Sequence, residues 1–152
     1  MRRIVIHAVA LACAAFIGKQ AAHAGSYAAA EINMWAGPST RYPFIGSLPE
    51  GTSLHVFGCT ERFRWCDVEG GGRRGWVSAA YIDVAYDTRR VRVPMYVRDV
   101  DAPMVPTISF NISTYWSSHY SSCDFYEDVD TWDDLDWETD APPPGWEPDW
   151  DE

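Results

Sequence analysis

The chain has 152 residues and a net charge of −10, with 22 acidic and 12 basic side chains. A chain of this length is typical of a single domain. The acidic balance argues against nucleic acid as a partner, because phosphate binding needs clustered lysine and arginine side chains.

The first 24 residues (1–24) have the pattern of a secretory signal peptide. Arg2 and Arg3 form a short positive region, residues 4–17 form an apolar run, and residues 22–24 read Ala-His-Ala, a small-x-small cleavage site. Because the run is too short to span a bilayer, we expect export, cleavage after residue 24 and no stable membrane span. A buried N-terminal helix and a lipid anchor at Cys13 are the disfavoured alternatives. The mature protein is then periplasmic or secreted.

Residues 30–83 consist of short apolar runs separated by turn signals. Alternating polarity predicts five strands, at residues 31–35, 44–48, 53–59, 65–68 and 75–77. Glycine and proline punctuate the loop at residues 36–43, and the glycines within residues 69–74 suit a hairpin turn. Five short strands without a helical period predict an all-β fold with a small barrel.

Two cysteines stand at the end and the beginning of consecutive predicted strands, namely Cys59 and Cys66. Export places them in an oxidising compartment, and such hairpin positions lie opposite each other at disulfide distance. Closing so short a loop adds about 2–3 kcal/mol of stability. No second Cys or His pair accompanies them, so we expect a disulfide and no metal. Cys123 is left over, either as a free thiol or for a covalent dimer.

Three motifs in this region carry a family resemblance: INMWAGPSTRYPFIG at residues 32–46, LPEGT at 48–52, and WCDV at 65–68 followed by GWVSAAYI at 75–82. Together they resemble bacterial SH3 domains, in which a strand leads into a Gly-Pro loop and a second strand ends in Ile-Gly. The resemblance implies an SH3-like barrel over residues 30–83 and a module that binds cell-wall peptides. Trp35 stands where family members usually carry arginine, so no ligand contact of that arginine is carried over.

Aromatic side chains of the barrel are the candidates for ligand contacts. Half or more of them should belong to the core, because aromatic residues dominate burial in small domains. Tyr42 and Phe63 lie in predicted loops, and we expect them at the surface. The candidate set is Trp35, Tyr42, Phe63, Trp65, Trp76 and Tyr81.

Residues 84–126 form a basic, proline-containing segment followed by an aromatic one. The prolines at positions 94, 103 and 106 favour a linker, with an added edge strand as the alternative. Residues 107–112 alternate in polarity like a strand.

Residues 127–152 contain Asp, Glu and four tryptophans but no Lys or Arg. Self-repulsion and the scarcity of aliphatic residues predict a largely disordered acidic tail. Opposite charges on one chain meet at high effective concentration, so we expect this tail to fold back on a basic surface. The expected surface consists of Arg89, Arg90, Arg92 and Arg98.

Motifs for nucleophilic catalysis, zinc hydrolysis or phosphate binding are missing from the sequence. The acidic tail also lacks the turn glycine and terminal glutamate of a calcium loop. We therefore expect no enzyme and no cofactor, but an exported module that binds a cell-wall peptide or another peptide in an aromatic groove. The alternative is an interaction or structural protein whose acidic aromatic tail engages a basic partner.

Overall fold

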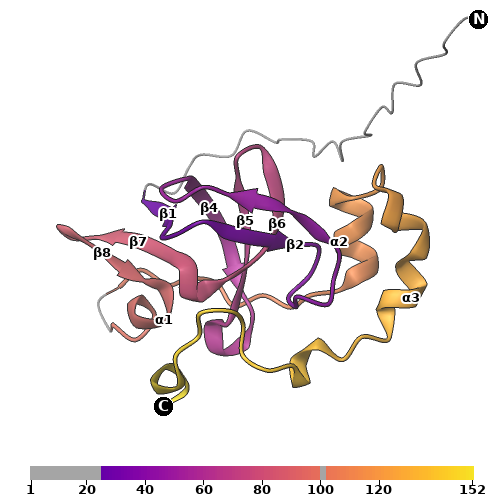
Figure 1. The fold of residues 1–152 in the computed structure, drawn as a ribbon. Helices are drawn as coiled ribbons and strands as arrows, with labels where there is room; N and C mark the ends of the chain where they lie inside the picture. Colours follow the sequence, from indigo (N-terminus) through magenta and orange to yellow (C-terminus); the bar gives the residue numbers. More distant parts are fainter. Residues whose placement is uncertain (1–24, 100–101) are drawn as a thin grey trace, which may run out of the picture.

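Eight antiparallel strands form the centre of the protein in a computed structural model that describes residues 25–99 and 102–152 (Figure 1). They make one curled sheet in the order β3-β2-β6-β5-β4-β1-β7-β8. The all-β, small SH3-like barrel predicted from the sequence is thereby confirmed. The predicted signal peptide lies outside the described residues. The strands are β1 (Ser26–Ala28), β2 (Ile32–Trp35), β3 (Phe44–Leu48), β4 (Ser53–Cys59), β5 (Trp65–Gly70), β6 (Arg73–Ser78), β7 (Ile82–Tyr86) and β8 (Arg89–Arg92).

The five predicted strands correspond to β2 through β6, with ends that differ by two residues at most. The turn between β5 and β6 is made by Gly71 and Gly72, whose φ angles are +56° and +73°. Two-residue hairpin turns of this kind need positive φ at both central positions, which glycine adopts without strain. The glycine run therefore sets the register of this hairpin.

Alternating apolar positions of the strands fill the interior of the barrel. Ile32 and Met34 of β2 point into it together with Leu54 of β4, and each is at most 2% exposed. In β5, by contrast, four consecutive residues are buried, so both faces of this strand are covered. A strand buried on both faces requires a second layer outside the barrel.

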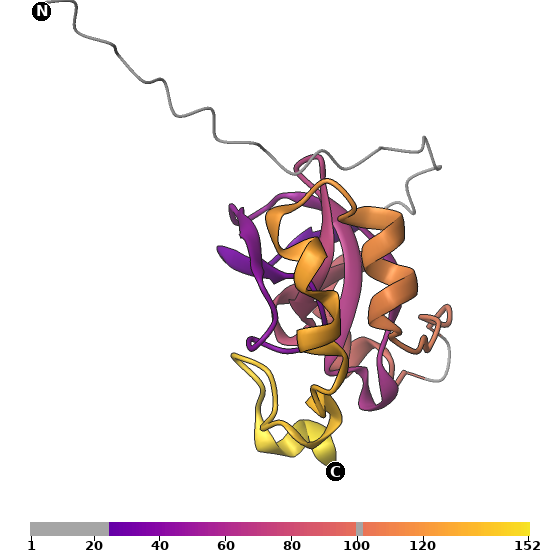
Figure 2. The ribbon, with the colours of Figure 1, turned by 90° about the vertical axis from the view of Figure 1, so that its right-hand side faces the viewer.

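That second layer is the C-terminal part of the chain. It contains the helices α2 (Ile112–His119) and α3 (Val129–Asp133), with 3₁₀ turns at Asp124–Asp128, Trp137–Thr139 and Pro148–Asp151. Figure 2 shows both helices lying against the strands. The disordered tail expected at residues 127–152 is thus ordered instead, because its aromatic side chains supply the apolar surface that its few aliphatic residues do not. Among the described residues, no helix is long and apolar enough to cross a membrane.

The segment at residues 107–112 is not the strand that its alternation predicts. Only Thr107 forms a bridge, in parallel to Cys59 of β4. The chain then turns into α2, whose first turn is capped by Asn111: its Oδ1 accepts a hydrogen bond from the Thr114 N–H at 2.9 Å. Side-chain capping of this type satisfies a backbone donor that would otherwise lack a partner and starts the helix at this point.

Residues 82–92 extend the sheet and do not form the linker that the prolines favoured. β7 and β8 pair as a hairpin, which is the edge-strand alternative. Pro94 lies in the first turn of the short helix α1 (Val93–Tyr96). Backbone N–H groups of a first turn make no hydrogen bond within the helix, so the N–H that proline lacks costs nothing there. The proline thus starts a helix without interrupting a strand.

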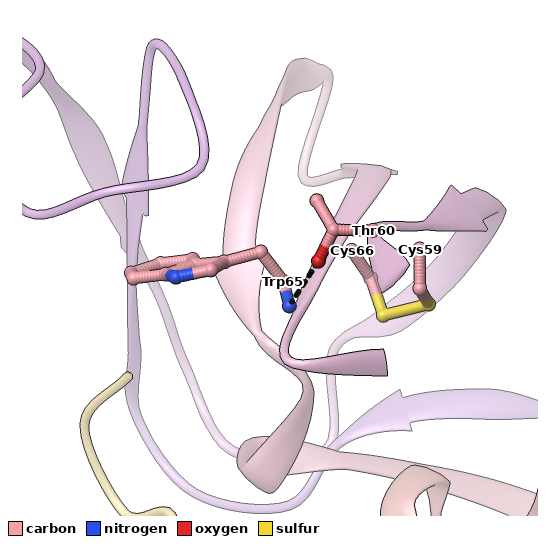
Figure 3. The surroundings of a disulfide bond; sticks show 4 residues. All are labelled: Cys59, Thr60, Trp65 and Cys66. Carbon is pink, nitrogen blue, oxygen red and sulfur yellow. Dashed lines mark hydrogen bonds between the residues drawn. A yellow bond between two sulfur atoms is a disulfide. The ribbon is translucent and has the colours of Figure 1, made fainter. Parts of the chain in front are cut away.

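The predicted disulfide is present between Cys59 of β4 and Cys66 of β5 (Figure 3). The two residues are cross-strand partners, and neither is exposed to solvent. The bond closes the connection that carries the 3₁₀ turn Glu61–Phe63. The Thr60 hydroxyl accepts a hydrogen bond from the Trp65 N–H at 3.2 Å, so the same connection is held a second time.

Replacing both cysteines, as Cys59→Ala/Cys66→Ala, is expected to lower the free energy of unfolding by about 2–3 kcal/mol, because the unfolded chain gains loop entropy. Urea titration followed by circular dichroism measures the change. The difference from the wild type should shrink when both proteins are unfolded in a reductant. Native protein in which both thiols can be alkylated would contradict the disulfide.

Cys123 does not have the free thiol that the sequence analysis considered. No described cysteine is free, and Cys123 is itself disulfide-bonded. It is only 8% exposed and packs in the C-terminal layer.

Candidate functional site

The six aromatic ligand candidates divide into a buried and a half-buried group. Trp35, Phe63 and Tyr81 are half-buried. The others are almost inaccessible, since Trp76 is 1% exposed, Tyr42 3% and Trp65 5%. The expectation of an exposed Tyr42 is therefore wrong. The structure does not gather the six residues into one exposed aromatic groove.

The C-terminal layer is the reason for this burial. The ring of Tyr42 lies edge-on to Phe110 at 5.4 Å and to Trp116 at 6.4 Å. Trp76 contacts the same Phe110 at 5.5 Å. Edge-to-face pairs at these distances stabilise beyond their buried area. The outer aromatic face of the barrel is thus covered by aromatic residues of the same chain.

A buried polar network fastens α2 to this face. The carboxylate of Asp67 accepts hydrogen bonds from Nε and Nη2 of Arg74, at 2.8 and 2.7 Å, and from the Tyr115 hydroxyl at 2.6 Å. The Tyr120 hydroxyl donates to the Arg74 carbonyl at 2.8 Å. Asp67 is 3% exposed, and a buried charge is tolerated only when it is paired and hydrogen-bonded as here. The network therefore joins β5, β6 and α2.

The pKa values in the network keep its hydrogen-bond donors protonated. Burial, followed by the neighbouring Tyr120 and Asp67, raises the pKa of the Tyr115 phenol well above its ordinary value. Burial and then the Arg74 charge lower the pKa of the adjacent His119. At neutral pH, Tyr115 is therefore a hydrogen-bond donor and His119 is uncharged.

The acidic residues of the tail contact arginines of the barrel. Asp140 pairs with Arg41, and Asp151 accepts from Nη2 of Arg64 at 2.8 and 2.9 Å. The tail thus folds back on a basic surface, as predicted, but not on the arginines that were expected. Of those four, Arg98 alone contacts the tail, through the main-chain oxygen of Asp149, in the part of the chain that the structure describes.

An open groove of about 910 Å³ lies where the barrel meets the C-terminal layer. Three stretches of chain line it, within residues 60–65, 107–110 and 137–141. Aromatic rings of Trp65, Phe110 and Trp137 belong to this lining. Trp65 is thus the one sequence-predicted candidate that reaches the groove.

Both signs of charge line the groove. Arg62 and Glu61 are exposed on the 60–65 loop, and Glu138 is exposed on the opposite stretch. Arg62 and Phe63 hold left-handed φ angles of +61° and +52°, which ordinary side chains rarely adopt. The disulfide at the base of this loop helps to hold that backbone. Strained residues of this kind are concentrated at functional sites.

The strands β2 to β6 lie within the range of a recognised family. Residues 30–83 match the family model of the bacterial SH3 domain. Domains of this family are generally non-catalytic binding modules. A search of curated proteins and a search of solved structures found no match. Among the described residues, no group of three or more His, Cys, Asp or Glu side chains could hold a metal ion.

The range that matches the family model contributes only one side of the groove. The lining stretches at residues 107–110 and 137–141 lie outside the matched range. Sequence reasoning missed Phe110 and Trp137, since the resemblance ends at residue 83 and the tail composition predicted disorder. Their signal was the aromatic density of residues 110–137, which is apolar surface that a folded chain buries.

Proposed function

We propose that the protein is a non-catalytic, exported binding module that recognises a peptide of the bacterial cell wall. The groove between the SH3 domain and the C-terminal layer is the proposed site. The observation that carries the proposal is the combination, in one open groove, of three aromatic rings with exposed charges of both signs. The match to a family of binding modules supports it.

Cell-wall stem peptides carry carboxylates as well as a free amine. In this proposal Arg62 binds a ligand carboxylate, and Glu61 and Glu138 bind the amine; all three line the groove. The apolar parts of the peptide would pack on the half-buried rings of Phe110 and Trp137, with the buried Trp65 behind them. The volume of the groove falls within the range typical of ligand sites, and polar side chains make up most of its lining.

Location outside the cytoplasm belongs to the same proposal. The buried Cys59–Cys66 disulfide is expected in an oxidising compartment, and the signal-peptide pattern of residues 1–24 leads there. The alternative, an acidic aromatic tail that captures a basic partner, receives less support. Trp116, Trp132 and Trp137 pack within the layer, and Asp140 and Asp151 pair with the barrel.

Binding to purified peptidoglycan sacculi tests the proposal, followed by calorimetry with a soluble stem peptide. The Arg62→Gln variant is expected to bind about fivefold more weakly, because one exposed charge contact contributes about 1 kcal/mol. The matched control is Arg73→Gln, another exposed arginine, on β6 and outside the groove, which should bind like the wild type. Full sacculus binding by Arg62→Gln would place the ligand elsewhere, and no binding by the wild type would refute the proposed ligand.

A further inference from the structure

A second surface lies outside the SH3 domain, at the end of the sheet. β8 is the last strand in the sheet order, and its ladder partner within the described chain is β7 alone. An edge strand presents unpaired N–H and C=O groups along its free side. In Figure 1 the β7–β8 hairpin projects from the barrel on the side opposite to α2 and α3. The C-terminal layer therefore does not cover this edge.

A pocket of about 370 Å³ accompanies the edge, between the hairpin and α1. Its apolar side is made by Tyr86, Tyr96 and Met95. The two tyrosine rings meet edge-on at 5.3 Å, and Met95 is 48% exposed. Exposed methionine beside aromatic rings is an adaptable surface for an apolar side chain.

The charged lining of this pocket is mainly basic, with three arginines of β8 against one carboxylate, Asp99. Arg89 and Arg90 are exposed, and neither forms an ion pair within residues 25–99 and 102–152. The guanidinium of Arg90 stacks on Tyr27, with 4.0 Å between its Cζ and the ring centroid, which orients it. Arg92 of the same strand is instead engaged by Asp83 at 2.7 Å.

Two carboxylates of the tail are paired with other arginines. Asp140 pairs with Arg41 and Asp151 with Arg64, so these two acidic groups are bound to the barrel and not to β8. The acidic tail therefore does not neutralise the positive charges of Arg89 and Arg90. These two arginines call for acidic groups from another molecule.

We propose that the β8 edge binds an acidic peptide segment of a partner protein, which adds to the sheet as an extended strand. Main-chain hydrogen bonds to β8 would supply affinity, and an apolar side chain of the segment would enter the pocket at Met95. Carboxylates on the segment would meet Arg89 and Arg90. The same two arginines disfavour pairing with β8 of a second copy, since like charges would then face each other.

Fluorescence anisotropy of a labelled heptapeptide with alternating glutamate and leucine tests the proposal on the mature chain. This peptide is expected to bind, with an affinity that falls on adding salt. Replacing its glutamates with lysine should abolish binding. Replacing its central leucine with proline should weaken binding at least tenfold, because proline cannot donate to the strand ladder.

The matching protein variants are Arg89→Gln/Arg90→Gln and, as control, Arg73→Gln. The double variant is expected to bind the acidic peptide about tenfold more weakly, from two exposed charge contacts, while the control stays within about twofold. Thermal midpoints of all three proteins should agree. Binding of the proline peptide at full strength would rule out the added strand. Binding to anionic lipid vesicles without binding to the peptide would replace the protein partner with a membrane. Because Arg62 and the groove are not involved, this proposal and the proposed function can fail separately.

Discussion

Trp116→Ala is expected to lower the free energy of unfolding by about 3–5 kcal/mol, since removing a fully buried tryptophan loses transfer energy and leaves a cavity. Trp116 is 0% exposed at the centre of the C-terminal layer. Its ring lies 4.8 Å from Phe125 and 6.4 Å from Trp132, and its Nε1 donates to the Ala36 carbonyl at 2.8 Å. The variant also leaves that carbonyl without its donor. Urea unfolding followed by circular dichroism measures the loss.

Limited proteolysis shows which part of the protein is destabilised by Trp116→Ala. We expect cleavage of the Trp116→Ala variant within residues 107–152 before the disulfide-closed barrel is attacked, because loss of the layer exposes that chain first. The matched control is Trp35→Ala, the same substitution at a half-buried position whose ring contacts the exposed Phe44. It should cost less than about 2 kcal/mol. Wild-type stability and protease resistance in Trp116→Ala would mean that the layer is not held by this residue.

Asp67→Asn is expected to cost about 3 kcal/mol, which is the lower end for breaking a buried ion pair. The amide cannot accept both hydrogen bonds of Arg74 as the carboxylate does, and the guanidinium loses its counter-charge. The Arg74 side chain keeps 18% exposure, so water compensates part of this loss. The Tyr115 hydroxyl loses its charged acceptor as well. Chemical unfolding of the variant beside the wild type measures the change.

Two further variants measure separately the hydrogen bond that α2 makes to Asp67 and the contribution of a more exposed ion pair. Tyr115→Phe keeps the ring and removes one hydrogen bond to Asp67, with an expected cost of about 1–2 kcal/mol. Asp83→Asn breaks the more exposed pair with Arg92 and should cost at most about 1 kcal/mol. If Asp67→Asn were as mild as Asp83→Asn, burial would not strengthen the contribution of Asp67 in the way proposed here.

Local patterns in the sequence determined the barrel. The five strands and the glycine turn follow from features of residues close together in the sequence. These features are the alternation of polarity, the β-branched and aromatic side chains, and the residue types of the turn. The Cys59–Cys66 bond was predictable for the same reason, since the two residues flank one short connection. Trp65 lines the groove for a local reason too: it begins the strand that follows the 60–65 loop.

The rest was decided by contacts between distant residues. Tyr42 stands in a loop that composition predicts to be exposed, and it is buried because Phe110 and Trp116 pack on it. No local pattern relates positions 42 and 116. The acidic tail illustrates the same limit: its composition predicts repulsion and disorder, but its aromatic rings gain burial against a face that exists only once the barrel has formed. Arginines at positions 41 and 64 then neutralise two of its carboxylates. Sequence alone thus determined the strands and the disulfide, whereas the groove required the tertiary structure, because its two sides come from segments that meet only when the aromatic layer is buried.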